Sequence, residues 1–161
     1  MSAAANFAVR FLASGGFVSY VPARITGFKK FTGSGMAGSL LAMALVPFLP
    51  EGKNFAFFCL AFLPFSIWIA GRASDIYGTH DDPRIVIDEF IGLWTALLFL
   101  DRTPFNLAAA FIFFRALDTL KPWPIKQLET SVRGGFGIII DDVLAGAEAN
   151  LLARLAAFIF L

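Results

Sequence analysis

Long apolar runs dominate the chain, and short polar or proline-rich breaks separate them. The runs cover about residues 36–49, 54–70, 85–100, 105–117 and 138–161. A helix needs about 20 apolar residues to cross a bilayer, with a range of about 17–25. Some runs are shorter or contain acids, but the breaks between them are clear, so we interpret all five as apolar helices. Pro64 is expected to kink the second helix, because proline removes a backbone donor.

The first 13 residues have a mixed pattern, with Phe7 and Phe11 on one side and Arg10 between them. This pattern is typical of an amphipathic helix that lies on a membrane surface. The sequence therefore predicts an all-α polytopic membrane bundle, with about five apolar helices and an amphipathic N-terminal segment. Its length suits a single domain over residues 1–161.

Composition strengthens the membrane interpretation. Hydrophobic residues make up 58% of the chain and charged residues only 16%, whereas soluble domains have about 25% charged residues. The net charge of +1 does not favour nucleic-acid binding. Cys59 is the single cysteine, which excludes an internal disulfide. The sequence points to no protein partner.

Lys and Arg are distributed unevenly between the two faces that five alternating helices define. Ten of the 13 fall on the face of the N-terminal segment, and they are Arg10, Arg24, Lys29, Lys30, Arg72, Arg84, Arg115, Lys121, Lys126 and Arg133. Only Lys53, Arg102 and Arg154 fall on the other face. The positive-inside rule makes the first face cytoplasmic.

Most acids fall on the same face. They are Asp75, Asp81, Asp82, Asp88, Glu89, Asp118, Asp141 and Asp142. Single acids at a helix N-terminus stabilise its dipole by about 0.3–1 kcal/mol. The adjacent pairs Asp88–Glu89 and Asp141–Asp142 each follow three apolar residues. Such pairs indicate a functional site, because ionised groups near hydrocarbon are costly and usually functional. Asp118 follows Arg115 by three residues, so the two share a helix face.

Carboxylates without sulfur ligands, in a chain with one histidine, favour a hard cation such as Mg²⁺ or Mn²⁺. Arg and Lys beside them are typical phosphate ligands. Together with their place at one membrane face, these features indicate a phospholipid headgroup as the substrate. With the family resemblance described below, they lead to the hypothesis of metal-assisted hydrolysis of a phosphomonoester. His80, beside Asp81 and Asp82, fits either a structural or a catalytic histidine.

Two other functions use clustered acids in membranes. A small cation transporter or channel component would need acids near the bilayer midplane, and would not need Arg115 and Lys121 beside them. A CDP-alcohol transferase would have an Asp-Gly-x-x-Ala-Arg run, which the sequence lacks.

Three blocks resemble the signature blocks of the phosphatidylglycerophosphatase A family. They are THDDPRIVIDEFIG at 79–92, FRALDTLKPWPI at 114–125 and GGFGIIIDDVLAG at 134–146. The resemblance covers about residues 71–146. It implies a magnesium-dependent enzyme of the bacterial inner membrane, with a cytoplasmic active site, that converts phosphatidylglycerophosphate to phosphatidylglycerol and phosphate. Before the first apolar helix, residues 34–40 lack the Pro and Thr of the family's Pro-Gly-Thr-x-Gly-Ser-Leu stretch.

These considerations give a set of expected roles. The expected metal ligands are Asp88, Glu89, Asp141 and Asp142. The expected catalytic residues are Asp81, Asp118, Arg115, Lys121 and His80, with Asp82 as the alternative to Asp81. The expected substrate-binding residues are Arg84, Lys29, Lys30 and Gly135. Lys29 and Lys30 either reach the lipid phosphates or attract anionic headgroups at about 1 kcal/mol each. Direct attack by water and a phospho-aspartyl intermediate both stay open.

Overall fold

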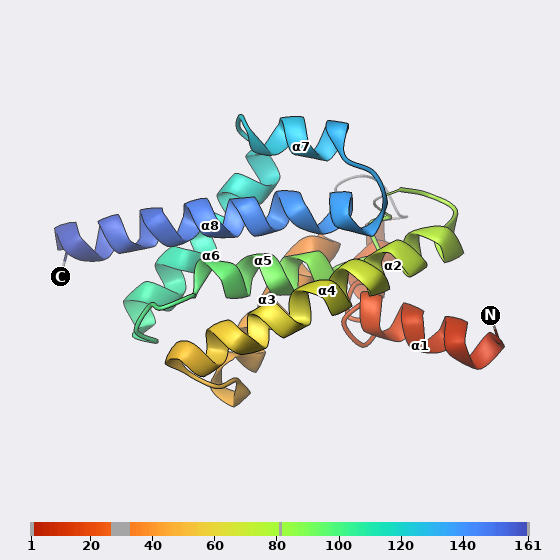
Figure 1. The fold of residues 1–161 in the computed structure, drawn as a ribbon, viewed down its shortest axis with the longest axis horizontal. Coiled ribbons are helices and arrows are strands. Elements are labelled where there is room, and N and C mark those ends of the chain that lie inside the picture. Colours follow the sequence, from red (N-terminus) through yellow and green to blue (C-terminus); the bar gives the residue numbers. More distant parts are fainter. Residues whose placement is uncertain (1, 27–32, 81, 161) are drawn as a thin grey trace.

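The computed structural model describes residues 2–26, 33–80 and 82–160, and the regular structure within them is helical (Figure 1). The prediction of an all-α fold is therefore confirmed. The predicted site residues Lys29, Lys30 and Asp81 lie outside the described residues. The elements in order are α1 (Ala3–Ala13), α2 (Tyr20–Thr26), α3 (Ser34–Leu45), the 3₁₀ turn η1 (Val46–Phe48), α4 (Gly52–Tyr77), α5 (Ile87–Ala96), α6 (Pro104–Leu120), α7 (Ile125–Ser131) and α8 (Gly134–Phe160).

The short helix α5 forms the centre of the bundle. Nine of its ten residues are buried, and it packs against α3, α4, α6 and α8. The long helix α8 also packs against α4, α6 and α7. A helix that is apolar on all sides needs such a complete surround. The acids in the first turn of α5 therefore start inside the bundle.

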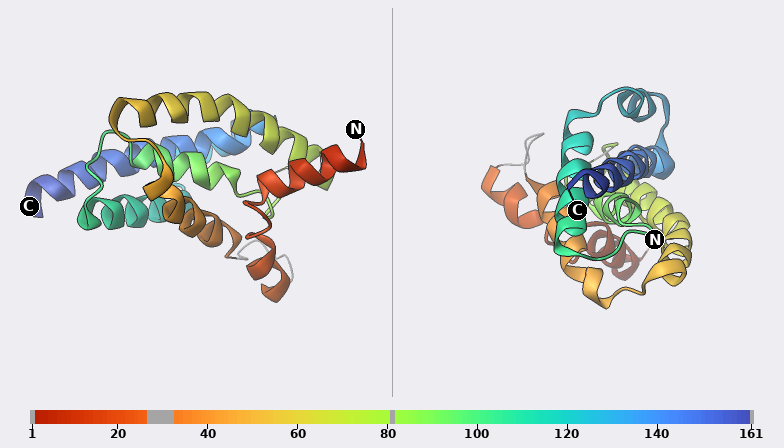
Figure 2. Two further views of the ribbon diagram at one scale, coloured as in Figure 1. Left: turned by 90° about the horizontal axis from the view of Figure 1, so that it is seen from below. Right: turned by 90° about the vertical axis from the view of Figure 1, so that its left-hand side faces the viewer.

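The helices are less uniform than the five apolar runs predicted. Among the described residues, only α4 with 26 residues and α8 with 27 are long and apolar enough to cross a membrane. The ten residues of α5 rise about 15 Å, half of a bilayer core of about 30 Å. The prediction of about five apolar spans is therefore not confirmed. The helix α4 continues through Pro64 and follows a curved course (Figure 2).

The connections between helices collect at two ends of the molecule. The α3–α4 and α5–α6 connections lie at the end that contains the C-terminus (Figures 1 and 2). The α4–α5 and α7–α8 connections lie at the opposite end, near α1. This arrangement agrees with the alternation inferred from the sequence, and it places the first turns of α5 and α8 at the same end.

Side chains satisfy carbonyl groups where the short helices stop. Arg102 Nη1 donates to the carbonyl of Leu49, just beyond η1, at 2.9 Å. Asn150 Nδ2 and Arg154 Nη2, both from α8, donate to the carbonyl of Leu98 beyond α5, each at 2.9 Å. Helix ends leave carbonyls unpaired, which is costly away from water. Polar side chains therefore satisfy the carbonyl groups just beyond α3 and α5.

Candidate active site

A close crossing of α5 and α8 positions the acids. A Cβ on Gly146 would overlap the carbonyl oxygen of Gly92, and a Cβ on Gly92 would lie 2.9 Å from the carbonyl oxygen of Asp142. Asp88 precedes Gly92 by four residues, and Asp142 precedes Gly146 by four. Residues four apart lie on the same helix face. Both aspartates therefore project into the region where the two helices meet.

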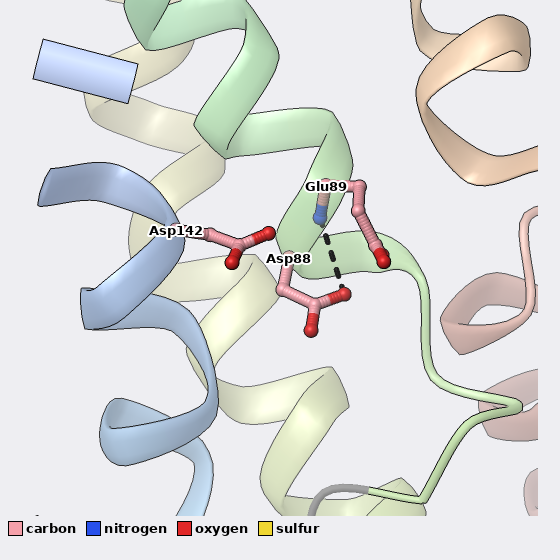
Figure 3. Close-up of side chains that lie close together, drawn as sticks. All are labelled: Asp88, Glu89 and Asp142. Carbon is pink, nitrogen blue, oxygen red and sulfur yellow. Dashed lines mark hydrogen bonds between the residues drawn. The ribbon is translucent and has the colours of Figure 1, made fainter. Parts of the chain in front are cut away.

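Asp88, Glu89 and Asp142 form a cluster of three carboxylates (Figure 3). One oxygen from each lies within 4.8 Å of the others, and the backbone N–H of Glu89 donates to Asp88 Oδ1 at 3.1 Å. Within the described part of the chain, the buried atoms Glu89 Oε2 and Asp142 Oδ2 have no hydrogen-bond partner. Buried carboxylates are costly unless a cation compensates them. The three residues therefore fit a hard divalent cation, which prefers oxygen ligands.

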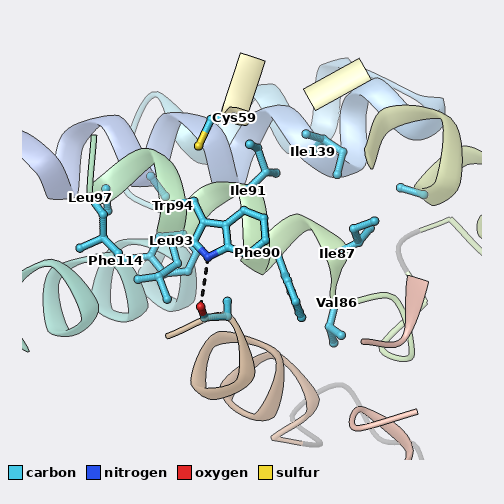
Figure 4. Packing of buried hydrophobic residues seen from close by; sticks show 14 of the residues in the cluster. Cys59, Val86, Ile87, Phe90, Ile91, Leu93, Trp94, Leu97, Phe114 and Ile139 are labelled. Atoms are coloured by element: carbon cyan, nitrogen blue, oxygen red, sulfur yellow. Dashed lines mark hydrogen bonds between the residues drawn. The ribbon is translucent and has the colours of Figure 1, made fainter. Parts of the chain in front are cut away.

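Large apolar side chains pack around α5 (Figure 4). Trp94 lies at the centre, with ring centroids 5.1 Å from Phe62 and 5.5 Å from Phe58 and Phe90. Its Nε1–H donates to the carbonyl of Ala42 in α3 at 3.0 Å. This packing fixes α5 against α3 and α4, so the acids at its start are held on a rigid element.

Two ion pairs accompany the three carboxylates. On α6, Arg115 Nη1 lies 2.8 Å from Asp118 Oδ2. Just beyond α6, Lys121 Nζ lies 2.7 Å from Asp141 Oδ2 on α8. Negative charge on Asp118 acts on both Glu89 and Asp142, so the pairs and the cluster belong to one electrostatic unit. The structure thus brings together the predicted residues of α5, α6 and α8. Asp141, however, forms an ion pair with Lys121 and is not part of the three-carboxylate cluster.

The helix α3 also contributes to the site, through Gly35 and Ser39, which were not among the predicted site residues. A Cβ on Gly35 would overlap Glu89 Oε1 and would lie 3.3 Å from Arg115 Nη2. The hydroxyl of Ser39 accepts from Arg115 Nη1 at 3.1 Å. The available signal was the spacing of small residues in 34–40, which allows a helix to approach its neighbours closely.

Asp82 and Arg84 fasten the α4–α5 connection. Arg84 Nε donates to Asp82 Oδ1 at 2.7 Å and Nη2 donates to Oδ2 at 2.8 Å. The guanidinium lies 3.9 Å from the ring centroid of Tyr77, and the hydroxyl of Thr79 donates to Asp82 Oδ2 at 2.8 Å. Arg84 was predicted to bind substrate and Asp82 was the alternative loop acid. In this structure they bind each other and brace the segment that leads into α5.

His80 and Gly135 lie where chain segments meet. The backbone N–H of Gly134 donates to His80 Nε2 at 3.1 Å, which links the α4–α5 connection to the start of α8. A Cβ on Gly135 would overlap the carbonyl oxygen of Ile67 and would lie 2.7 Å from the nitrogen of Gly71. Gly135 therefore permits close contact between α8 and α4. Its predicted role in substrate binding, and the catalytic role of His80, stay predictions.

The Asp82–Arg84 pair predicts a pH-dependent stability. Burial alone raises the pKa of Asp82, but hydrogen bonds from Arg84 and Thr79 outweigh burial and hold this pKa below its usual value. An unfolded Asp titrates at about pH 3.9, so the stabilisation is present above that pH and is lost as the pH falls through the lower native pKa. We expect Asp82→Asn to lower the thermal unfolding midpoint in detergent at pH 7, by a gap that shrinks below about pH 4.

The matched control for this experiment is Asp75→Asn on α4. Asp75 is 72% exposed and pairs with Arg72 at 3.6 Å, and exposed pairs contribute about 0–1 kcal/mol. Its midpoint should stay close to that of the parent protein across the pH range. A gap for Asp82→Asn that is equally large at pH 3 and pH 7 would contradict the role given to this carboxylate.

Comparison with known proteins identifies the family. The sequence profile described as "Phosphatidylglycerophosphatase A" matches residues 11–157. The Escherichia coli (strain K12) protein of that name is 38% identical over 116 residues, which is 70% of this chain and 67% of the relative. The Haemophilus influenzae protein of that name is 35% identical over 122 residues, covering 75% of this chain and 74% of the relative.

A third relative has a different name. This Bacteroides thetaiotaomicron protein, provisionally named a phosphatidylinositol-3-phosphatase, is 34% identical over 144 residues, which is 83% of this chain and 89% of the relative. No solved structure matches the chain. The profile and two of the relatives carry the same family name that the three signature blocks suggested. The chain therefore belongs to the phosphatidylglycerophosphatase A family.

Proposed function

We propose that this protein is a magnesium-dependent lipid phosphatase that converts phosphatidylglycerophosphate to phosphatidylglycerol and phosphate. Family membership and the names of two relatives support the reaction. The observation that carries the proposal is the cluster of Asp88, Glu89 and Asp142, with two buried carboxylate oxygens that lack partners within the described residues. Few arrangements other than a cation site retain such groups.

The chemistry follows from the donor set. Asp88, Glu89 and Asp142 would hold Mg²⁺, which when bound supplies polarisation of a phosphate oxygen and a lowered pKa for water. The guanidinium of Arg115 and the ammonium of Lys121 would bind phosphate oxygens and offset their charge. Arg115 pairs with Asp118 and Lys121 pairs with Asp141, the neighbour of Asp142, and we propose that the two cations and the metal bind the same phosphate group.

Membrane embedding accounts for the exposed apolar surface. Large side chains on the two long helices face outward, among them Phe57 (68% exposed), Leu151 (67%) and Phe158 (87%). We propose that α4 and α8 cross the bilayer and that α3, α5 and α6 complete a multi-pass bundle. Backbone that ends inside a membrane must be satisfied by protein groups, and Arg102, Asn150 and Arg154 meet this requirement.

The N-terminal helix α1 adds to the membrane contact, at the end of the molecule where the α4–α5 and α7–α8 connections lie. Phe7 and Phe11 on α1 are 62% and 45% exposed, while Val9 is buried. This division supports α1 lying along the membrane surface. With the excess of Lys and Arg at this end, the active site would face the cytoplasm, at the inner membrane of a bacterium. Attraction of anionic lipids by Lys29 and Lys30 is part of the same proposal.

The charges beside the acids argue against a cation transporter. Asp88 and Glu89 lie in the first turn of α5, and Asp142 lies about two turns into α8 (Figure 3). Arg115 and Lys121, which pair with neighbouring acids, would repel a passing cation. A phosphatase site, in contrast, uses acids to hold a metal ion and basic side chains to bind the phosphate oxygens.

The Bacteroides relative makes a second lipid phosphate worth testing. We expect purified protein in mixed micelles with Mg²⁺ to release phosphate from phosphatidylglycerophosphate with a higher kcat/KM than from phosphatidylinositol 3-phosphate. The measurement is released inorganic phosphate, with phosphatidylglycerol identified by mass spectrometry. Turnover of the inositol lipid with none of phosphatidylglycerophosphate would overturn the assigned substrate and leave the lipid phosphatase class standing.

A further inference from the structure

The neighbouring acids Asp141 and Asp142 on α8 have different surroundings. Successive residues of an α-helix point about 100° apart, so the two carboxylates can meet different neighbours. Asp142 joins Asp88 and Glu89 within 4.8 Å. The Oδ2 of Asp141 instead lies 2.7 Å from Lys121 Nζ. The pair that looks uniform in the sequence is divided between a carboxylate cluster and a cation.

Lys121 reaches Asp141 from a constrained position. It ends α6 with φ 43°, in the left-handed region that residues other than glycine seldom adopt. Its side chain is 23% exposed, while that of Asp141 is only 6% exposed. The acid is therefore the more buried partner, and the lysine side chain stays partly exposed.

Arg115 shows the same arrangement on α6. Its Nη1 contacts Asp118 Oδ2 at 2.8 Å and the Ser39 hydroxyl at 3.1 Å. Its buried Nε has no acceptor among residues 2–26, 33–80 and 82–160. Its Nη2 lies beside Gly35, where Glu89 Oε1 also lies. An anchored guanidinium with a donor left over, next to the carboxylate cluster, is suited to receive an anion.

We propose that Asp141 and Asp118 are positioning residues that hold Lys121 and Arg115 as a two-cation cradle for the substrate phosphate. In this arrangement Asp88, Glu89 and Asp142 face the metal, and the other two acids face the cations. This inference rests on the proposed function, because it assumes that the ligand is a phosphate group. It replaces the expectation that Asp141 is a fourth metal ligand.

The physical reason for such holding residues is side-chain freedom. Lysine has a flexible four-carbon stem, and arginine loses much rotamer entropy when it is fixed. A buried carboxylate that fixes the cation before substrate arrives removes this loss from the binding step. Removing the carboxylate should therefore weaken phosphate binding while the metal ligands stay in place.

The first experiment separates metal binding from phosphate binding. Mn²⁺ binding to the full-length protein in detergent is measured by electron paramagnetic resonance of the free ion. Asp142→Asn should weaken Mn²⁺ binding by about ten- to a hundredfold. Asp141→Asn removes a nearby charge but no expected ligand, so it should weaken Mn²⁺ binding much less. Asp101→Asn, a control at the exposed α5–α6 connection, should bind Mn²⁺ as the parent protein does. Equal losses in Asp141→Asn and Asp142→Asn would overturn the proposal.

The second experiment measures phosphate directly. Binding of inorganic phosphate with Mg²⁺ present is followed by ³¹P line broadening, which needs no turnover. Asp141→Asn should weaken phosphate binding and raise KM for the lipid by about tenfold, with a smaller effect on kcat. Asp141→Glu should restore part of the loss. Unchanged phosphate binding in Asp141→Asn would overturn the inference.

Further variants guard against misfolding and separate the two proposals. Lys121→Gln should weaken phosphate binding as Asp141→Asn does, and Lys53→Gln, on an exposed lysine at the start of α4, should not. If Asp141→Asn does not fold, Lys121→Gln decides, and full phosphate binding in it would overturn the cradle. If the parent protein binds phosphate but hydrolyses no lipid, the proposed function fails while the cradle survives.

Discussion

Asp142→Asn is expected to abolish phosphate release, with kcat lowered by about a thousandfold or more, as expected when a principal electrostatic contact of a catalytic site is lost. Asn keeps the size of the side chain but removes its charge. Asp142 is 4% exposed and lies in the cluster with Asp88 and Glu89, so neither water nor another acid can substitute for it. Phosphate release in mixed micelles, with saturating Mg²⁺, is the measurement.

Stability should move in the opposite direction to activity in this variant. Without metal, burial and the nearby acids Asp118, Asp88 and Asp141 disfavour negative charge on Asp142, and the neutral side chain of Asn avoids this cost. The thermal unfolding midpoint of metal-free Asp142→Asn should therefore equal or exceed that of the parent protein. Asp101→Asn serves as the control for both readouts. Retention of at least half the parent activity in Asp142→Asn would remove this residue from the site.

Gly146→Ala is expected to destabilise the protein severely and to abolish activity with it. The added Cβ would overlap the carbonyl oxygen of Gly92 and would lie 3.0 Å from the Cβ of Thr95. Backbone cannot rotate away as a side chain can, so α5 and α8 must separate. Overpacking of a tight core costs about 1–3 kcal/mol, and separation would also move Asp142 away from the acids of α5. The measurements are the thermal unfolding midpoint and phosphate release.

The sign of the stability change makes this variant informative. Ala has a helix propensity about 1 kcal/mol better than Gly, so a helix without a close crossing would gain stability. The control is Ala147→Leu, which adds bulk at the exposed neighbouring position and should change both measurements little. A midpoint for Gly146→Ala above that of the parent protein would contradict the close crossing of α5 and α8.

The sequence predicted the helical class and the gathering of acids because both depend on local patterns. Apolar runs of helical length predict helices, and Asp88 and Asp142 stand at fixed places in two of them. Helix lengths inside the membrane were harder to predict. An apolar run is equally compatible with a span and with a buried core helix, so residues 85–100 gave no indication that α5 ends at Ala96.

The features of the site that the sequence did not predict depend on the directions in which side chains point. Asp141 and Asp142 are adjacent in the sequence, and only the packing of α6 against α8 shows which one meets Lys121. Gly35 has no reactive group, so its contact with Glu89 and Arg115 depends on where α3 packs. Sequence patterns place residues on elements, whereas roles at a shared site depend on how elements from distant segments approach one another.

Release of phosphate from phosphatidylglycerophosphate, followed as Mg²⁺ is removed and returned, tests the central claim most directly. The three-carboxylate site predicts release by the purified protein with Mg²⁺, loss of release when a chelator removes the ion, and recovery when Mg²⁺ is added back. Release that continues at an unchanged rate in the chelator, or no release with Mg²⁺ present, would contradict a metal-dependent lipid phosphatase at Asp88, Glu89 and Asp142.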